Sequence, residues 1–334
     1  MPTFSIILPV RNGGELVKEC VNSILAQSYT DFNLLILDNV STDGTLEWVR
    51  SVPDDRIKVY PAQKPLSIEE NWGRITSIPK NEFITLIGHD DILNSDYLET
   101  MHGLISRYPD AGLYQTHFIY IDTKGEKVRS CKSMAAVESV EDFIKNFLTR
   151  NIDVMGTGFM MRSKGYDLLG GIPPYPNLLF ADFELWINMS KLTYKATSPN
   201  ECFSFRIHQS TTTVSPDIKF HRAFERFIYF LNSLKAERES FDIIITKYAG
   251  EFLSVYCKSL SHRLLRTPIK KRDRLTVEQF INNCKQYARL LGIEDRFKPG
   301  KIFSIRVAKI VDSNVFTRFV FLSFKKIFPK PILK

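Results

Sequence analysis

The stretch ITLIGHDDIL, Ile84 to Leu93, places two adjacent carboxylates, Asp90 and Asp91, directly after a run of apolar and small residues. Such a run is typical of a buried β-strand. Like charges repel each other, so a pair of acids at the end of a buried strand requires an explanation. Two explanations are open: one acid caps a helix that begins near Ser95, or the pair binds a divalent cation.

The 334-residue chain has an ordinary globular composition, with 44% hydrophobic and 25% charged residues. It has no run of the roughly 18 apolar residues that would suggest a membrane-spanning helix. Its first residues form a strand pattern rather than the basic region of a signal peptide. The five cysteines are scattered, without a disulfide framework or a CxxC spacing. We therefore expect a protein of the reducing cytoplasm.

The net charge of +8 is unevenly distributed along the chain. Residues 215–334 contain 25 Lys and Arg against 11 Asp and Glu, a balance of +14, and residues 1–214 contain 20 against 26, a balance of −6. The change of sign predicts two domains, 1–214 and 215–334. A basic C-terminal domain suggests a surface for an anionic partner, which is phospholipid, a lipid-linked phosphate or nucleic acid.

Strand-like apolar runs alternate with helix-like segments in the N-terminal part of the chain. The predicted strands are Phe4–Val10, Phe32–Asn39, Ile57–Ala62 and Phe83–Gly88, and the predicted helices between them are Glu15–Ala26, a helix through Leu46 and Val49, and Ile68–Ile78. This alternation predicts an α/β fold in which helices flank a mostly parallel sheet with right-handed crossovers. Residues 219–260 favour helices, so we expect a mainly helical C-terminal region.

Polar side chains stand at the ends of three predicted strands. They are Arg11 and Asn12 after the first strand, Asp38 and Asn39 after the second, and Asp90 and Asp91 after the fourth. One acid at a strand end is usually part of a turn or a cap. In open α/β sheets, however, ligands bind at the carboxyl ends of the strands, so three polar ends at one edge predict a binding site.

The sequence lacks two common motifs that bind nucleotide phosphates. No GxGxxG follows the first strand, and no GxxxxGK[ST] occurs. A nucleotide bound without a glycine-rich cradle needs another way to neutralise its phosphates. Mg²⁺ and Mn²⁺ prefer oxygen ligands and often use one or two protein carboxylates, which is what Asp90 and Asp91 offer.

Several segments occur in the order, and near the spacing, of one known family. They are SIILPVRNG, LLILDNVSTDGT, NWGRI, ITLIGHDD, GTGFMMRSKGYDLLGGI (Gly156–Ile172), ADFELWINM (Ala181–Met189) and FRIHQSTTT (Phe205–Thr213). Over roughly residues 3–213 the chain resembles a family 2 glycosyltransferase with the GT-A fold, of the kind that builds bacterial polysaccharide or lipid-linked glycan. It departs at Asn39, Gly88 and Ala181, where the family has an acid, and each departure leaves one neighbouring acid in place.

The resemblance implies transfer of a hexosyl or N-acetylhexosaminyl group from a nucleotide-diphosphate sugar, most often a UDP-sugar. The implied acceptor is a hydroxyl of a glycan or lipid-linked glycan, and the reaction inverts the anomeric carbon with Mn²⁺ or Mg²⁺ as cofactor. Such a transfer needs a general base, neutralisation of the leaving diphosphate, and in-line placement of donor and acceptor.

The resemblance also implies roles for individual residues. Asp182 is the implied general base and Glu184 the second candidate, while the structural alternative for Asp182 is a first-turn acid favoured by the helix dipole. The implied metal ligands are Asp90, Asp91 and His208, and the sequence does not decide which aspartate binds directly. A diphosphate contact or a structural role stays open for His208, and His89 is a weaker candidate.

The implied donor-binding residues are Pro9, Arg11, Asp38, Asp90, Arg74 and Arg206. Of these, Asp38 is expected on the base or ribose, although a turn stabilised by its own side chain is compatible with that role. Arg74 and Arg206 are expected near the diphosphate, and the alternative for both is a solvated or paired surface arginine. Trp72 and Trp186 are expected in the core.

The segment Val315–Phe328 is apolar around most of a helical wheel, with a narrow stripe of Arg318 and Lys325. It either packs on the catalytic domain or lies on an anionic membrane surface, which would make the protein peripheral. We expect no nucleic-acid partner, because such a partner would leave the strand-end acids without a purpose, and the oligomeric state is not predicted. A catalytically inactive nucleotide-sugar-binding module and a nucleotidyltransferase that makes nucleotide sugars remain alternatives.

Overall fold

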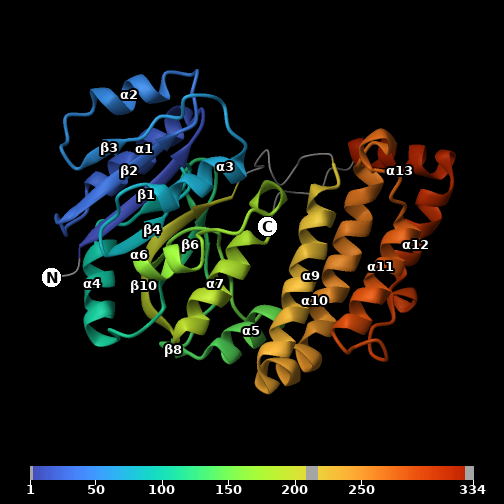
Figure 1. The fold of residues 1–334 in the computed structure, drawn as a ribbon. Coiled ribbons are helices and arrows are strands. Elements are labelled where there is room, and N and C mark those ends of the chain that lie inside the picture. Colours follow the sequence, from blue (N-terminus) through green and yellow to red (C-terminus); the bar gives the residue numbers. More distant parts are fainter. Residues whose placement is uncertain (1–2, 208–216, 328–334) are drawn as a thin grey trace. The chain divides into compact units, whose positions relative to one another are not determined.

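The computed structural model describes residues 3–207 and 217–327. The chain divides into two compact units, and the second unit from residue 217 onward is coloured from yellow to red in Figure 1. The N-terminal unit contains residues 1–143 and 152–207, and the C-terminal unit contains residues 144–151 and 208–334. The predicted boundary between residues 214 and 215 falls outside the described residues and stays a prediction.

The N-terminal unit is built on one sheet of ten strands. The strands are β1 Phe4–Val10, β2 Phe32–Asp38, β3 Ile57–Val59, β4 Phe83–Leu86, β5 Ile92–Leu93, β6 Leu113–Ile121, β7 Lys127–Ser130, β8 Val137–Glu138, β9 Phe159–Arg162 and β10 Lys195–Arg206. The helices between them are α1 Gly14–Leu25, α2 Thr45–Ser51, α3 Ile68–Gly73, η1 Arg74–Ser77, α4 Tyr97–Arg107, α5 Val140–Leu148, α6 Ser163–Leu168, η2 Pro176–Leu178 and α7 Ala181–Leu192.

The strand order is β3-β2-β1-β4-β9-β6-β10-β5, with β7 beside β6 and β8 beside β10. Strands β1 to β4 pair in parallel, as the alternating pattern predicts. The sheet becomes mixed beyond β4, because β9 runs antiparallel to both of its neighbours, β4 and β6. The α/β class is therefore confirmed, and the sheet is parallel in its N-terminal half and mixed in the rest.

The core of this unit follows from the apolar patterns of its strands and helices. Every residue of β1 is buried, as expected for a strand inside a parallel sheet. Helix α1 buries Val17, Cys20, Val21 and Ile24, whose spacing of three and four places them on one stripe. Each such aliphatic side chain contributes about 1.5–3 kcal/mol when it is fully buried. This packing fixes where the strand ends lie.

The loops that follow β1 and β2 are hydrogen-bonded to each other. The backbone N–H of Asn12 donates to Ser41 Oγ over 2.9 Å, and its side-chain oxygen accepts from Thr42 N over 2.8 Å. The N–H of Gly14 donates to Asp43 Oδ2 over 2.9 Å. The breaks RNGG and STDGT in the sequence therefore form one paired rim at the carboxyl edge of the sheet.

Two elements are shorter than the sequence predicts. The third strand ends at Val59 rather than Ala62, and the helix expected from Ile68 to Ile78 is α3 followed by the 3₁₀ turn η1. Helix α3 begins with a capping box in which Ser67 and Glu70 exchange hydrogen bonds. Only the first six residues of the expected helix are therefore α-helical.

The C-terminal unit is mainly helical in its described part, as predicted. Its elements from residue 219 onward are α9 Lys219–Glu237, α10 Glu239–Arg266, η3 Ile269–Lys271, α11 Val277–Leu290, η4 Pro299–Lys301, α12 Phe303–Ser313 and α13 Val315–Ile327. The long helix α10 packs against α9, α11, α12 and α13 (Figure 1). Within residues 3–207 and 217–327, no helix combines the length and apolar character needed to cross a bilayer.

Arg318 on α13 is buried and binds the C-terminal end of α10. Its Nε donates to Leu265 O over 3.2 Å, and its Nη2 donates to Thr267 O over 2.6 Å. The last carbonyls of a helix lack partners within the helix and form the negative end of its dipole, so a guanidinium is stabilised there. The interpretation of Arg318 as part of a surface stripe is therefore wrong.

We expect the substitution Arg318→Leu to lower the free energy of unfolding by about 2 kcal/mol, because it removes a donor from Leu265 O and one of the two donors from Thr267 O, the other being Arg272 Nε. Urea denaturation followed by circular dichroism measures this. The matched control is Phe319→Ala, one residue away on the exposed side of the same helix, where a change within about 0.5 kcal/mol is expected. Equal stability of the two variants would contradict the assigned role.

Candidate functional site

Asp90 and Asp91 leave the sheet at the end of β4 and do not cap a helix. The short strand β5 follows them, and helix α4 begins at Tyr97 with Asp96 in the cap position. The helix-cap explanation for the pair is therefore wrong. The two carboxylates instead lie at the carboxyl edge of the sheet, next to the ends of the other central strands.

The carboxylate of Asp91 is buried and bonded on both oxygens. Thr157 Oγ1 donates to Oδ2 over 2.7 Å, and the backbone N–H of Arg206 donates to Oδ1 over 3.1 Å. Burial raises the pKa of Asp91 well above its ordinary value, and the neighbouring charge of Asp90 raises it further. The negative charge at this position is thus costly unless a cation offsets it.

Gly88 brings the two carboxylates together. A Cβ atom added to this glycine would lie 2.8 Å from Asp90 Oδ1 and 3.1 Å from Asp91 Oδ2, so any side chain here would collide with the pair. This contact accounts for the glycine that stands where the family has an acid. The paired oxygens are the hard ligands that Mg²⁺ and Mn²⁺ prefer, so the donor set fits such an ion.

The described residues do not supply a complete set of protein ligands for a metal. No group of three or more His, Cys, Asp or Glu side chains with metal-binding geometry occurs within residues 3–207 and 217–327. His208, the implied third ligand, lies outside the described residues. An ion at Asp90 and Asp91 would therefore complete its shell with water, substrate phosphate or a residue outside this range.

The guanidinium of Arg206 is buried among protein acceptors. Its Nε donates to Asp90 O over 2.9 Å, its Nη1 to Asp122 O over 3.2 Å, and its Nη2 pairs with Glu19 Oε2 over 2.6 Å. These bonds fix the backbone of the carboxylate pair. The contact between Arg206 and a diphosphate stays a prediction, and the positioning role is the one that these bonds support.

Asp38, at the end of β2, is buried with one oxygen bonded and one not. Its Oδ2 accepts from Ser41 N over 3.2 Å, whereas Oδ1 has no hydrogen-bond partner among the described residues. A buried acceptor without a partner is uncommon and is often explained by a ligand donor. Arg74 lies behind it, donating to Asp38 O over 3.3 Å and to Tyr60 O over 2.6 Å.

A pocket of about 610 Å³ opens beside Arg74. The loop of residues 61–66 forms its other wall. Asn39 anchors this loop, donating from Nδ2 to Leu66 O over 2.9 Å and accepting from Leu66 N over 2.8 Å. Only an amide can both donate and accept here, which accounts for Asn39 where the family has an acid.

Two further implied donor residues lie at the end of β1. Pro9 is buried in the strand, in register with Leu37 of β2. Arg11 follows the strand and is exposed. Their position at the carboxyl edge agrees with the expected pocket, and their contact with a ligand stays a prediction.

Asp182 and Asp91 contact the same short segment, Gly156–Thr157–Gly158. A Cβ atom added to Gly156 would lie 3.3 Å from Asp182 Oδ2, and the next residue bonds Asp91. Asp182 is partly exposed, yet the packing around its carboxyl group raises the pKa to about 7. The candidate base and the candidate metal ligand therefore contact neighbouring residues of one segment, Gly156 and Thr157.

The backbone before Asp182 is strained. Asn177, Leu178 and Phe180 all have positive φ values, of 56°, 54° and 68°, which bulky L-residues rarely adopt. Such strain persists only where the surrounding structure enforces it, and it clusters at functional sites. The side chain of Glu69 on α3 holds this loop by accepting from Asn177 N over 2.7 Å.

The other two implied residues of α7 have structural partners. Glu184 accepts a short hydrogen bond from Tyr175 OH, so its carboxylate is less available as a base than that of Asp182. Trp186 is fully buried, stacks on Phe159 and donates from Nε1 to Met155 O over 2.9 Å. The prediction that Trp186 belongs to the core is confirmed.

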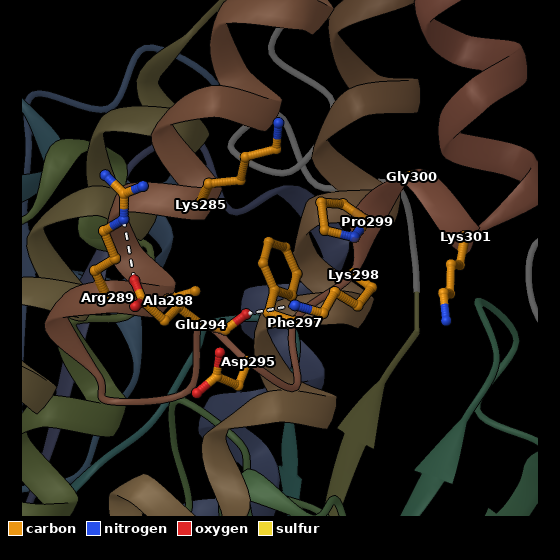
Figure 2. Close-up of a pocket in the computed structure, with 10 residues that line it drawn as sticks. All are labelled: Lys285, Ala288, Arg289, Glu294, Asp295, Phe297, Lys298, Pro299, Gly300 and Lys301. Carbon is orange, nitrogen blue, oxygen red and sulfur yellow. Dashed lines mark hydrogen bonds and ion pairs between the residues drawn. The ribbon is translucent and has the colours of Figure 1, made fainter.

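A second pocket lies in the C-terminal unit, between the end of α11 and η4 (Figure 2). Its charged groups do not converge. Arg289 pairs with Glu294 over 3.0 Å, and Figure 2 shows Lys285 and Lys301 pointing away from each other. Its basic groups therefore do not form an anion cradle.

Thr157 and Glu19 are site residues that the sequence analysis did not single out. Thr157 stands between two glycines just before a strand, and that pattern was a usable signal for a hydroxyl held close to the sheet edge. Glu19 lies on α1 and reaches Arg206 across 187 positions of the chain. No local sequence pattern predicts a contact between residues so far apart in the chain.

Comparison with known proteins shows what the chain is similar to. The sequence model of the family described as "Glycosyl transferase family 2" matches residues 5–168. Glycosyltransferase GlyG of Streptococcus pneumoniae is 25% identical over 123 residues, which are 36% of this chain and 41% of that protein. An uncharacterized glycosyltransferase of Haemophilus influenzae is 20% identical over 332 residues, which are 90% of this chain and 96% of that protein.

Two solved structures share the fold. S. aureus TarS 1–349, in complex with UDP-GlcNAc, aligns with a TM-score of 0.61 at 15% identity, over 92% of this chain and 91% of that one. Mannosyltransferase PcManGT from Pyrobaculum calidifontis, in complex with GDP-Man and Mn²⁺, aligns with a TM-score of 0.53 at 14% identity, over 98% of this chain and 88% of that one. Residues 5–168 therefore match the glycosyl transferase family 2 model, whereas Asp182 and Arg206 lie beyond the matched residues, and the GT-A fold is confirmed.

We expect the substitution Asn39→Asp to loosen the loop of residues 61–66. The carboxylate cannot donate to Leu66 O and would face that carbonyl with a like charge, at a cost of about 1–3 kcal/mol. Hydrogen exchange measured by mass spectrometry should show the amide of Leu66 exchanging at least about tenfold faster.

The control for this experiment is Asn22→Asp, an exposed position on α1. It makes the same chemical change without touching the loop, so the exchange of Leu66 should stay at the wild-type rate. An unchanged rate in the Asn39 variant as well would show that the amide does not hold the loop.

Proposed function

We propose that this protein transfers a sugar from a UDP-sugar to a hydroxyl of a glycan or lipid-linked glycan acceptor, with inversion of the anomeric carbon. The transferred group is a hexosyl or N-acetylhexosaminyl group. The observation that carries the proposal is the segment 156–158, which contacts Asp182 on one side and Asp91 on the other. An inverting transfer needs a base on the acceptor side and charge neutralisation on the diphosphate side, close together.

The donor side of the site is the edge formed by β1, β2 and β4. The unpartnered Oδ1 of Asp38 is available to a donor group of the base or ribose, and the pocket beside Arg74 has room for the base. The carboxylate of Asp90, supported by Asp91, would hold Mn²⁺ or Mg²⁺, and the structure of PcManGT, which shares this fold, contains Mn²⁺. When bound, the ion neutralises charge that develops on the leaving diphosphate.

Of the two carboxylates, Asp90 is the better direct ligand. Both oxygens of Asp91 already accept hydrogen bonds, and its side chain is buried, whereas Asp90 is partly exposed. Asp91 therefore stabilises the structure around the site through its hydrogen bonds to Thr157 and to the backbone of Arg206. Arg206 holds the backbone of the pair in place through Asp90 O.

In this proposal Asp182 takes the proton of the acceptor hydroxyl. Its pKa of about 7 lies where a general base works best at neutral pH, because the group is both ionised and basic. The strained loop of residues 177–180 precedes it and shapes the approach of the acceptor. The five cysteines are free in the structure, in agreement with action in the reducing cytoplasm.

We expect the affinity for UDP to depend on Mn²⁺ through Asp90. Isothermal titration calorimetry should show tighter binding of UDP with Mn²⁺ than with EDTA. The substitution Asp90→Asn should remove most of this difference, because an amide is a weaker ligand without charge. The control Asp55→Asn removes an exposed acid elsewhere in the unit and should leave the difference intact. Equal affinity of the wild type in Mn²⁺ and EDTA would exclude the metal.

We expect kcat/KM to rise with pH up to about 7 and then to level off, because Asp182 must be ionised to accept a proton. Below that pH the rate should fall about tenfold for each unit as the carboxyl group is protonated. The substitution Asp182→Asn should lower turnover about a hundredfold or more and remove this limb. The affinity for UDP should stay near that of the wild type.

The companion variant is Glu184→Gln, on the same helix. Because Glu184 already binds Tyr175, its loss should change the rate much less than the loss of Asp182. A dead Glu184 variant beside an active Asp182 variant would move the base to Glu184. A wild-type protein that binds UDP but never turns over would be a nucleotide-sugar-binding module rather than an enzyme.

A further inference from the structure

One side of helix α13 is apolar and exposed. Val315, Phe316, Phe319, Val320 and Ile327 have exposed fractions of 81%, 72%, 67%, 50% and 70%. At 100° per residue these positions fall within an arc of about 140°. Exposed apolar side chains are unremarkable singly, but a contiguous row of this kind marks an interaction surface.

The opposite side of α13 is already used by the fold. Arg318 points into the unit and binds the end of α10, and Thr317 donates to Val311 O of α12 over 3.1 Å. Arg318 and Thr317 therefore face the protein, whereas the exposed apolar side chains named above face outward. Burial against the C-terminal unit's residues within 217–327 does not explain the apolar face.

A basic turn borders this face. The turn η3 carries Ile269, which is 63% exposed, followed by the exposed Lys270 and Lys271. Ile269 and Arg274 line the same pocket as Val315, the first residue of α13. The apolar face and the basic turn are therefore contiguous, and together they are called the docking surface below.

Acidic residues are scarce around the docking surface. Helix α13 has none, and residues 296–334 contain ten Lys and Arg against one acid, Asp312. Asp312 is buried and paired with Arg272 over 2.6 Å. The acid nearest to the turn in sequence, Asp273, is paired with Arg222. The surface thus combines exposed apolar groups with uncompensated positive charge.

We infer that the docking surface seats this protein on a membrane leaflet that contains anionic phospholipid. Phenylalanine and aliphatic side chains enter the boundary between headgroups and acyl chains, and lysines beside them meet the anionic headgroups. Helix α13, of 13 residues, lies along the leaflet and does not cross it. This inference does not rest on the proposed sugar transfer.

Charge decides between a lipid leaflet and a second copy of this chain. A symmetric pairing through the docking surface would place lysines of one copy against those of the other, without acids to offset them. An anionic leaflet supplies the opposite charge over the whole area. The same charges without the phenylalanines would fit nucleic acid, but the apolar row would then have no function.

The test is flotation of the full chain with vesicles. One set is phosphatidylcholine with about one third phosphatidylglycerol, and the other is phosphatidylcholine alone. Binding is expected to the first set, at least about tenfold above the second, and to weaken as salt is raised, because screening shortens the reach of surface charge. Replacing Lys270 and Lys271 by Gln should reduce binding about thirtyfold.

Matched variants separate the docking surface from general effects. Phe316→Ser with Phe319→Ser should abolish flotation, whereas Leu168→Ser with Ile243→Ser, at exposed apolar positions elsewhere, should not. Lys58→Gln with Lys164→Gln removes the same charge from the N-terminal unit and should also leave flotation unchanged. Unchanged melting temperatures confirm that each variant is folded.

Three outcomes would overturn the inference. One is equal binding to both vesicle sets, and another is loss of flotation in the control variants. The third is a concentration-dependent dimer, measured by light scattering, that the Phe316 and Phe319 substitutions dissolve while the protein never floats. That last result would assign the docking surface to a second copy.

Discussion

The buried carboxylate of Asp91 joins three separate parts of the N-terminal unit. It stands just after β4, accepts from Thr157 just before β9, and accepts from the backbone of Arg206 at the end of β10. A buried acid is tolerated only when its oxygens are satisfied. The same two hydrogen bonds therefore hold the strand ends together and satisfy both carboxylate oxygens of Asp91. What remains exposed at this edge is the neighbouring carboxylate, Asp90.

Two glycines make the arrangement possible. Gly88 leaves room for the paired carboxylates, and Gly156 leaves room for Asp182. The environments of the acids differ, since burial alone raises the pKa of Asp182, whereas burial and the charge of Asp90 both raise that of Asp91. Carboxyl groups whose environments differ in this way can take different chemical roles within one site.

The local patterns of the sequence were sufficient for the first four strands and for the polar residues at their ends. Strand β1 was predicted with its observed bounds, because a buried parallel strand is apolar throughout. The antiparallel insertion of β9 between β4 and β6 was not predicted, since it depends on pairing between distant segments. The short strand β5 was not predicted for the same reason. Without it, the sequence could not exclude that Asp90 or Asp91 caps a helix.

Side-chain roles were predicted less completely than the backbone. The acid positions could be predicted from strand ends and motif order. From the sequence alone, Asn39 and Gly88 are positions where an acid of the family is missing. Their roles follow only from the contact of Asn39 with Leu66 and of Gly88 with the carboxylate pair. Arg318 was misplaced because a helical wheel shows which residues share a face and not which face is buried. The acceptors that bury it lie more than fifty positions away.

The anchoring of α13 by Arg318 has a thermodynamic consequence. The helix is held to α10 before it meets any partner, so its apolar face is preformed. An anchor that folds only at its target must offset the entropy of ordering the chain, and a rigid face avoids most of that cost. Association through α13 would therefore leave the helical content unchanged and carry the negative heat-capacity change of apolar burial alone. After dissociation from its partner, α13 would keep the same conformation and could bind again without refolding.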